Sequence, residues 1–288
     1  MMQYKHNSVR IVVGGDATEL RENVVGWVKE SLRKRKMTYG IYTGTDWYRF
    51  LNLSHNLELE ADGIPIISIG GDGTMISALK YGFGSPVVGI NTGTLGYLTE
   101  IEPKKKAIDS AIGKIRSGEY FTQYCKTLEY NIWHKGKKVA EGRAVNDVVL
   151  ARDNAISNIV FDAHSGGRFI HRYSADGMVI ASPIGASAYA LSCGAPIIEP
   201  SSNIICMSPI APHSLNSRSM VFDSRAIIEL FVRRCRNEEV RTIVCADGRD
   251  EYELEEGDSV RVFLGKHDVA CIYFDCQAAY ERLARRLS

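Results

Sequence analysis

The chain carries almost no net charge, has no apolar run long enough to cross a bilayer, and contains no paired-cysteine motif. Its 35 basic and 34 acidic side chains leave a formal net charge of +1, so no overall field recruits nucleic acid or a membrane. Residues 1–6 lack the apolar core of a signal peptide, and we expect a cytoplasmic protein. The seven cysteines show neither C-x-x-C nor zinc spacing, so we expect most of them to be small buried hydrophobes.

Glycine is concentrated in one stretch, residues 65–74, which reads Pro-Ile-Ile-Ser-Ile-Gly-Gly-Asp-Gly-Thr. A β-branched run ends there in three glycines around Asp72, and a helix-compatible segment, 74–81, follows. Glycines let a bulky anion approach backbone N–H groups, and a helix start adds partial positive charge. The stretch therefore predicts a strand, a phosphate-binding turn and a helix.

Asp72 does not suit a simple phosphate cradle, because a carboxylate repels phosphate. Three explanations remain open from the residues alone. The carboxylate could hold a metal ion that bridges phosphates, or it could take the proton of an attacking hydroxyl. It could also be a structural cap of the helix.

The first 120 residues alternate between strand and helix patterns. Leu20, Val24, Val28 and Leu32 recur every four residues, which is typical of an amphipathic helix. Strands are predicted at 9–13, 39–43, 66–69 and 86–90, and further helices at 46–57 and 103–117, the last stopped by Gly118. This alternation predicts a doubly wound parallel sheet, whose ligands gather at the carboxyl ends of strands.

A second glycine turn, Gly14-Gly15-Asp16, follows the first strand. It could be another phosphate loop, but a first β-to-α turn often has this composition, and we favour the ordinary turn.

The pattern changes near residue 121. Short segments rich in β-branched and aromatic residues, separated by turn signals, predict a mostly antiparallel β-domain; they are 124–133, 138–150, 157–163, 168–181, 203–208, 225–233, 240–246, 258–264 and 269–274. We therefore expect an α/β domain at 1–120, a β-rich domain at 121–274, and a C-terminal segment, 275–288, that packs back on the first domain.

One stretch of the β-rich part is unusual. Residues 174–196 are mostly small, with three glycines at 177, 185 and 194, two prolines at 183 and 196, and a single tyrosine, Tyr189. Such a composition leaves room for a flat ligand, but it is equally typical of tight packing at a domain boundary, and both interpretations stay open.

Residues 70–74 resemble the signature of the NAD kinase and diacylglycerol kinase superfamily, and a close version occurs in phosphofructokinases. Four further motifs resemble those of NAD kinases in their order along the chain. These are Asn-Thr-Gly-Thr-Leu-Gly-Tyr-Leu at 91–98, Asn-Asp-Val-Val at 146–149, the Asp-Gly to Gly-Ala-Pro block at 176–196 and Pro-Ile-Ala-Pro-His-Ser-Leu at 209–215. By this resemblance the chain is identified as a member of the NAD kinase family.

The resemblance implies a Rossmann-like α/β N-terminal domain and a β-sandwich-like second domain. It implies transfer of a phosphoryl group from ATP or polyphosphate to the 2′-hydroxyl of the adenosine ribose of NAD, giving NADP. It also implies Mg²⁺ or another divalent cation with the donor, and a homodimer or homotetramer with sites near subunit contacts. Neither nucleic acid nor a membrane is expected as a partner.

The resemblance also implies roles for single residues. Asp72 is the expected proton acceptor, Asn146 and Asp147 the ligands of the nicotinamide-side ribose, and Asp176 a neighbour of the nicotinamide amide. The other expected dinucleotide contacts are Gly73, Ser174, Ser187, Ala188, Tyr189, Ser192 and, in a neighbouring subunit, Ala211. The expected phosphate loop comprises Gly70, Gly71, Gly73, Thr74 and Asn91, and no protein metal ligand is assigned.

The motifs depart from the family pattern at several positions. Asp147 replaces the commoner Glu, Ile184, Ala186 and Ser187 stand where Thr, Ser and Thr are usual, and Cys193-Gly194-Ala195 replaces a small-Gly-Gly run. These changes leave the preference between NAD and NADH open. A lipid kinase of the superfamily would lack the 176–196 block, and a non-catalytic dinucleotide sensor would have no use for Asp72.

Overall fold

The computed structural model describes residues 5–43, 63–82, 84–93, 96–153, 157–214, 216–233 and 241–275. The chain forms two compact units. The first runs to Tyr124 and resumes at Val269, and the second is Cys125–Asp268. The predicted helix at 46–57 and residues 276–288 of the predicted C-terminal segment lie outside the described residues. Among the described helices, none is both long and apolar enough to cross a bilayer.

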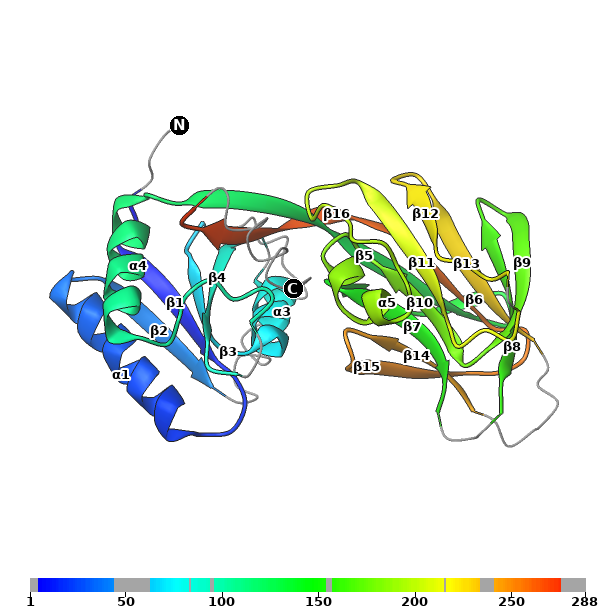
Figure 1. Ribbon diagram of the computed structural model, residues 1–288, viewed down its shortest axis with the longest axis horizontal. Helices are drawn as coiled ribbons and strands as arrows, with labels where there is room; N and C mark the ends of the chain where they lie inside the picture. Colours follow the sequence, from blue (N-terminus) through cyan, green and yellow to red (C-terminus); the bar gives the residue numbers. More distant parts are fainter. Residues whose placement is uncertain are drawn as a thin grey trace. The chain divides into compact units, whose positions relative to one another are not determined.

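The first unit is built on a parallel sheet with the strand order β2-β1-β3-β4. Figure 1 shows α1 and α4 on one face of this sheet and α3 on the other. Val24, Val28 and Leu32 of α1 are buried with Ile108, Ile112 and the apolar side chains of the strands in one core. The elements are β1 (Ser8–Val13), α1 (Glu19–Lys34), β2 (Thr38–Thr43), β3 (Ile66–Gly70), α3 (Asp72–Tyr81), β4 (Pro86–Asn91) and α4 (Lys105–Ser117).

The predicted alternation of strands and helices is confirmed in this unit, with differences at helix ends. α3 begins at Asp72, two residues before the predicted start, because Thr74 and Met75 both donate their N–H groups to the carbonyl oxygen of Gly71. α4 begins at Lys105 and ends at Ser117, and its C-cap residue, Gly118, has the left-handed φ of 79° expected of a glycine stop. Leu20, predicted on the buried face of α1, is 42% exposed.

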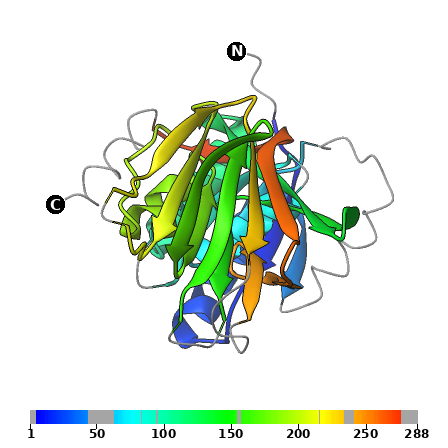
Figure 2. The ribbon, with the colours of Figure 1, turned by 90° about the vertical axis from the view of Figure 1, so that its right-hand side faces the viewer.

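The second unit is mostly antiparallel, as predicted. Figure 2 shows its strands with their broad faces toward the viewer. One sheet has the order β12-β11-β10-β7-β14-β15, and the other strands form the β16-β13-β8-β9 run with β5 and β6. A core containing Leu128, Phe161 and Ile180 draws on both sets of strands. The strands are β5 (Phe121–His134), β6 (Lys137–Ala144), β7 (Asp147–Arg152), β8 (Ile159–Ser165), β9 (Arg168–Ala175), β10 (Gly177–Ala181), β11 (Ile204–Ile210), β12 (Met220–Asp223), β13 (Ile227–Arg233), β14 (Thr242–Ala246), β15 (Asp250–Leu254) and β16 (Ser259–Tyr273).

Several strand boundaries differ from the prediction. The segment 138–150 is broken between β6 and β7 at Val145-Asn146, and 168–181 is broken between β9 and β10 at Asp176. Conversely, 258–264 and 269–274 belong to one long strand, β16, which pairs with β13 through Ser259–Phe263 and with β4 through Ala270 and Cys271. The short strands β12 and β15 were not predicted.

Part of the unusual stretch 174–196 packs on one face of the sheet that contains β10 and β11. After β10 it forms a 3₁₀ turn, η1 (Gly185–Ser187), and a short helix, α5 (Tyr189–Ser192). Ala186 and Ala190 are fully buried against Val179 and Cys206 of the sheet. Tyr189, by contrast, is 45% exposed. The small residues thus have a packing role within the second unit, while the tyrosine between them faces outward.

Candidate functional site

The glycine turn of the first unit lies where the strand order of the parallel sheet reverses. β1 and β3 are neighbours, while the chain continues outward to β2 on one side and to β4 on the other. Ligands of such sheets bind at this reversal, outside the carboxyl ends of the strands. The turns Gly14–Asp16 and Gly70–Gly73 both leave strands at that point, and Gly14 donates its N–H to the carbonyl oxygen of Ile69 at 3.1 Å.

Thr74 explains two of the glycines by packing alone. A Cβ placed on Gly70 would lie 2.2 Å from Thr74 Oγ1, and a Cβ on Gly14 would lie 2.1 Å from the same atom. Neither position can therefore carry a side chain while Thr74 keeps its place. This supports the interpretation of the Gly14 turn as an ordinary structural turn and gives Thr74 a packing role.

Packing does not explain why position 73 is a glycine. A Cβ at this position meets nothing within 4 Å, and the residue lies in the first turn of α3. The space above it is open, as a loop needs if a ligand is to approach its backbone closely.

Asp72 does not cap its own helix. Gly71 is the N-cap residue of α3 and makes no side-chain cap. The Asp72 carboxylate instead accepts the N–H of Tyr97 at 2.9 Å on Oδ1 and 2.8 Å on Oδ2, and the N–H of Leu98 at 2.9 Å on Oδ1. Since each carboxylate oxygen offers two acceptor sites, one site on Oδ2 remains after these bonds. Asp72 thus holds the segment after β4 and keeps room for one more donor.

Asn91 shapes its own loop. Its Oδ1 accepts the N–H of Gly93 at 2.9 Å, a side-chain turn that is common for asparagine. Thr92 donates its N–H to the carbonyl oxygen of Gly70, and a Cβ on Gly93 would lie 3.3 Å from Gly71 Cα. The turns after β3 and β4 therefore run backbone to backbone, with Asn91 supporting the second of them.

In the second unit, Asn146 lies in the link between β6 and β7, and Asp147 is the first residue of β7. Ser182 holds this link from one side, because its Oγ donates to the carbonyl oxygen of Val145 at 2.5 Å and its N–H donates to that of Asn146. Gly185 approaches so closely that a Cβ there would lie 1.9 Å from the carbonyl oxygen of Asn146. The side-chain Oδ1 of Asn146 is buried and accepts no hydrogen bond, which leaves an acceptor ready for a ligand donor.

Asp147 is a buried acid with an unusual protonation equilibrium. It is 7% exposed, and burial, followed by the charge of Asp247, raises the pKa of its carboxyl to about 7. Burial also raises the pKa of Tyr189, with smaller contributions from Cys193, Asp176 and Asp147, and it raises the pKa of Cys193, with a contribution from Asp147.

Asp176, at the break between β9 and β10, forms a two-point ion pair. Its Oδ1 accepts Nε of Arg152 at 2.9 Å and its Oδ2 accepts Nη2 at 3.1 Å. The N–H of Asp176 donates to the carbonyl oxygen of Ile210, next to Ala211, whose φ is 42°. Arg152 was not predicted from the sequence, and it orients the acid by a bidentate contact.

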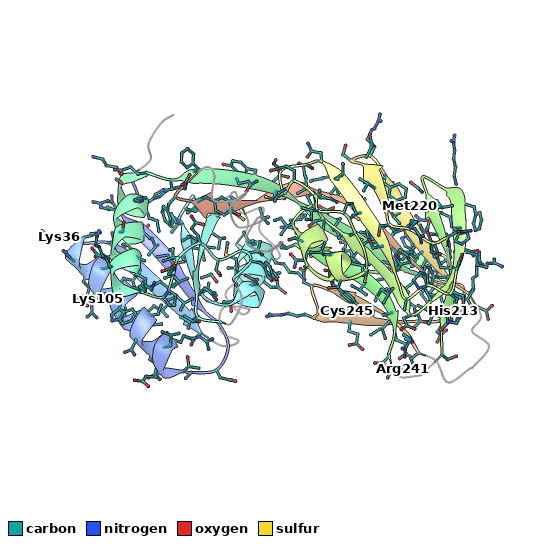
Figure 3. The ribbon with its side chains drawn as sticks, in the orientation of Figure 1. Lys36, Lys105, His213, Met220, Arg241 and Cys245 are labelled. Carbon is teal, nitrogen blue, oxygen red and sulfur yellow. The ribbon has the colours of Figure 1, made fainter. Side chains whose placement is uncertain are left out.

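Ser174 belongs to a different cluster of the same unit. It is exposed, its Oγ accepts Nδ2 of Asn158 at 3.2 Å, and its carbonyl oxygen accepts the N–H of His213. Nδ2 of Asn158 also lies 2.6 Å from Nε2 of His213, which is labelled in Figure 3. Ser187 donates its Oγ to the carbonyl oxygen of Ile184 at 3.0 Å. Ala188 and the exposed Ser192 flank Tyr189.

The structure thus gathers the predicted residues into two groups, one in each unit. Asp72, Gly73 and the turns around them form the first. The second comprises Asn146 and Asp147 at the start of β7, Asp176 beside Arg152 at the other end of that strand, and Tyr189 of α5. Among the described residues, no three His, Cys, Asp or Glu side chains gather closely enough to hold a metal ion. Arg152 and Asp247 were not predicted from the sequence. The Asp-Gly dipeptide at 247–248 signals a turn, but it does not show that this turn contacts residues 145–147.

Comparison with known proteins gives these groups a family. The ATP-NAD kinase N-terminal domain model matches residues 27–120 and the ATP-NAD kinase C-terminal domain model matches residues 145–274. An NAD kinase of Legionella pneumophila is 38% identical over 68% of this chain and 66% of its own length. An NAD kinase of Teredinibacter turnerae is 33% identical over 77% of this chain and 75% of its own length.

Solved structures agree on the fold. A yeast NADH kinase complexed with NADH superposes with a TM-score of 0.81 at 23% identity, covering 99% of this chain and 88% of that one. An NAD kinase from Archaeoglobus fulgidus in complex with ATP has a TM-score of 0.71 at 19% identity, covering 97% and 98%. With both domain models matched in order, the chain belongs to the NAD kinase family.

Proposed function

We propose that the protein phosphorylates NAD to NADP, with Asp72 as the general base. The observation that carries this proposal is the placement of the Asp72 carboxylate at the head of α3, beside the open backbone of Gly73, with one acceptor site left on Oδ2. A ribose hydroxyl is a poor nucleophile near neutral pH, and a carboxylate within hydrogen-bond reach improves it.

In the proposed reaction the 2′-hydroxyl of the adenosine ribose gives its proton to Asp72. Its oxygen then forms a bond to the terminal phosphorus of the donor. The bond from that phosphorus to the bridging oxygen breaks, and the shortened donor leaves with the electron pair. When the donor is ATP, the products are NADP, ADP and a proton. Positioning and charge stabilisation supply most of the catalysis in such transfers.

The donor phosphates are proposed to lie against the turns after β3 and β4, where backbone N–H groups and the start of α3 favour an anion. A divalent cation such as Mg²⁺, carried mainly by the phosphates, would offset their repulsion from Asp72. ATP and polyphosphate share this chemistry, because both present a chain of phosphates to backbone and cation.

The second group of residues is proposed to bind NAD. The unpaired Oδ1 of Asn146 and the carboxylate of Asp147 suit the two hydroxyls of a ribose, here that of the nicotinamide side. Asp176, held by Arg152, is proposed to meet the nicotinamide amide. Tyr189, with Ser187, Ala188 and Ser192, offers an aromatic face and small neighbours for the adenosine, and Ala211 is proposed to complete the pocket of a neighbouring subunit in a homodimer or homotetramer.

The experiment incubates the purified protein with NAD, Mg²⁺ and either ATP or polyphosphate, and measures NADP. Formation of NADP in either arm supports the proposal, and the productive arm identifies the donor. A parallel pair with NADH in place of NAD measures the acceptor preference. Binding of NAD without product in any arm would favour a non-catalytic dinucleotide sensor and overturn the proposal.

Gly73→Ala tests whether a ligand passes over the turn. The fold leaves room for this methyl group, and alanine in place of glycine in a helix adds roughly 0.5–1 kcal/mol of stability. We expect a melting temperature equal to or above that of the wild type, together with a kcat/KM at least tenfold lower. Gly26→Ala, in the middle of α1 and also without a neighbour within 4 Å, is the matched control and should leave kcat/KM unchanged. Equal activity of both variants would contradict a ligand at Gly73.

A further inference from the structure

Asp247 is a half-buried acid in the turn after β14, and its carboxylate faces the link between β6 and β7. It follows β14 and has a φ of 52°, a left-handed conformation that aspartate tolerates better than most residues. Its carboxylate accepts the N–H of Val145 at 2.9 Å on Oδ2 and that of Asn146 at 2.7 Å on Oδ1, with Asp147 N 3.4 Å from Oδ1. In return, the N–H of Asp247 donates to the carbonyl oxygen of Asp147 at 3.0 Å.

These contacts satisfy the donors of a link that has no strand partner of its own. Three successive N–H groups converge on one anion, which is a favourable arrangement for negative charge. Ser182 meanwhile accounts for the carbonyl oxygens of Val145 and Asn146. With its donors held by Asp247 and its acceptors held by Ser182, the link has little freedom, and the backbone from which the side chains of Asn146 and Asp147 project is held in place.

We propose that Asp247 is a positioning residue for the nicotinamide-side ribose: its carboxylate fixes the backbone of Asn146 and Asp147 and places a negative charge beside Asp147. This inference rests on the proposed function, because it takes Asn146 and Asp147 as the ribose ligands. Asp247 itself needs no contact with the dinucleotide.

The charge part of this role follows from the surroundings of Asp147. Burial raises the pKa of the Asp147 carboxyl first, and the charge of Asp247 raises it further, to about 7. Among the described residues, Tyr189 and Cys193 also interact electrostatically with Asp147; their pKa values are raised, so both stay neutral near pH 7. A carboxylate accepts two hydroxyl donors better than a carboxylic acid does. NAD affinity should therefore increase as pH rises through about 7.

The test measures NAD affinity by calorimetry, without donor, from pH 5.5 to pH 9 for the wild type, Asp247→Asn and Asp247→Glu. Asp247→Asn removes the charge, so the midpoint of the affinity increase should move to lower pH. The affinity at pH 8 should fall about tenfold, since charge-assisted hydrogen bonds to the link become ordinary ones. Asp247→Glu keeps the charge but misplaces it, so the affinity should fall while the midpoint stays.

Asp258→Asn is the matched control. Asp258 is another turn acid of the second unit and is buried; its carboxylate accepts the N–H of Glu255 at 3.0 Å and pairs with His134. Its removal should damage a turn without moving the NAD affinity or its pH midpoint. An unchanged midpoint in Asp247→Asn would overturn the proposal, because a purely structural acid would lower the affinity equally at every pH.

A titration of the Asp147 carboxyl by NMR in the free protein separates this inference from the proposed function. If the wild type failed to bind NAD, the proposed function would be wrong, and so would the ribose role of Asp247. A downward shift of the Asp147 titration in Asp247→Asn would still establish the charge coupling. No shift would overturn that coupling even if NADP were formed.

Discussion

Replacing Asp72 by asparagine is expected to lower turnover by roughly two to four orders of magnitude, the usual scale for a lost general base. NAD binding should persist, because the second group of residues is unaltered. The amide oxygen of asparagine still accepts a backbone N–H of Tyr97 or Leu98, while its NH₂ group cannot take a proton. The measurement compares kcat for NADP formation with the dissociation constant of NAD in the two proteins.

The control for this change is Asp16→Asn, an exposed acid in the neighbouring turn after β1 of the same unit. It removes a negative charge of the same kind without touching the turn after β3. Turnover of this control should stay within about threefold of the wild type. A loss of less than tenfold in Asp72→Asn would make the assignment of Asp72 as proton acceptor wrong.

Asp147→Asn is expected to stabilise the protein in a pH-dependent way. The pKa of this carboxyl rises from 3.8 to about 7 on folding. Between pH 4 and pH 7 the unfolded chain therefore ionises while the folded protein stays protonated, so the wild type loses stability as pH rises. At about 1.4 kcal/mol per pKa unit, the full loss is on the order of 4 kcal/mol. Asparagine cannot ionise, so the variant does not lose this stability as pH rises.

Urea unfolding at pH 4 and pH 8 measures this difference. The two proteins should have similar free energies of unfolding at pH 4, and the variant should be the more stable at pH 8, while its affinity for NAD falls. Asp223→Asn provides a control of opposite sign. Hydrogen bonds from Arg225 lower the pKa of Asp223, so the contribution of Asp223 is present above its usual pKa and lost as pH falls. A variant of Asp147 with no pH-dependent gain would contradict the buried-acid interpretation.

The sequence was most informative where local rules decide the structure. The four-residue spacing of Val24, Val28 and Leu32 identified α1, and the glycines around Asp72 identified the turn between β3 and α3. Strand breaks were harder to predict. The segment 138–150 has the composition of one strand, but Ser182 and Asp247 take the backbone groups of Val145 and Asn146 out of the ladder.

The residues that sequence reasoning missed are those whose role depends on distant parts of the chain. Asp247 is separated from the link that it holds by 100 to 102 positions, and no local pattern connects an Asp-Gly turn to an Asn-Asp pair. Arg152 ends an ordinary strand, β7, and only the antiparallel pairing of β7 with β10 brings it beside Asp176. Asp147 and Asp176 could be predicted from the sequence motifs, whereas the residues that hold them, Asp247 and Arg152, could not.

The packing of Thr74 has a consequence for how this protein tolerates mutation. Its stiff, β-branched side chain occupies the space that a Cβ on Gly14 or on Gly70 would need. Positions 14, 70 and 74 are therefore energetically coupled, although Gly14 is 56 positions from Gly70 along the chain (70 minus 14). The cost of a side chain at Gly14 depends on which residue stands at 74, so substitutions at these three positions will not be additive.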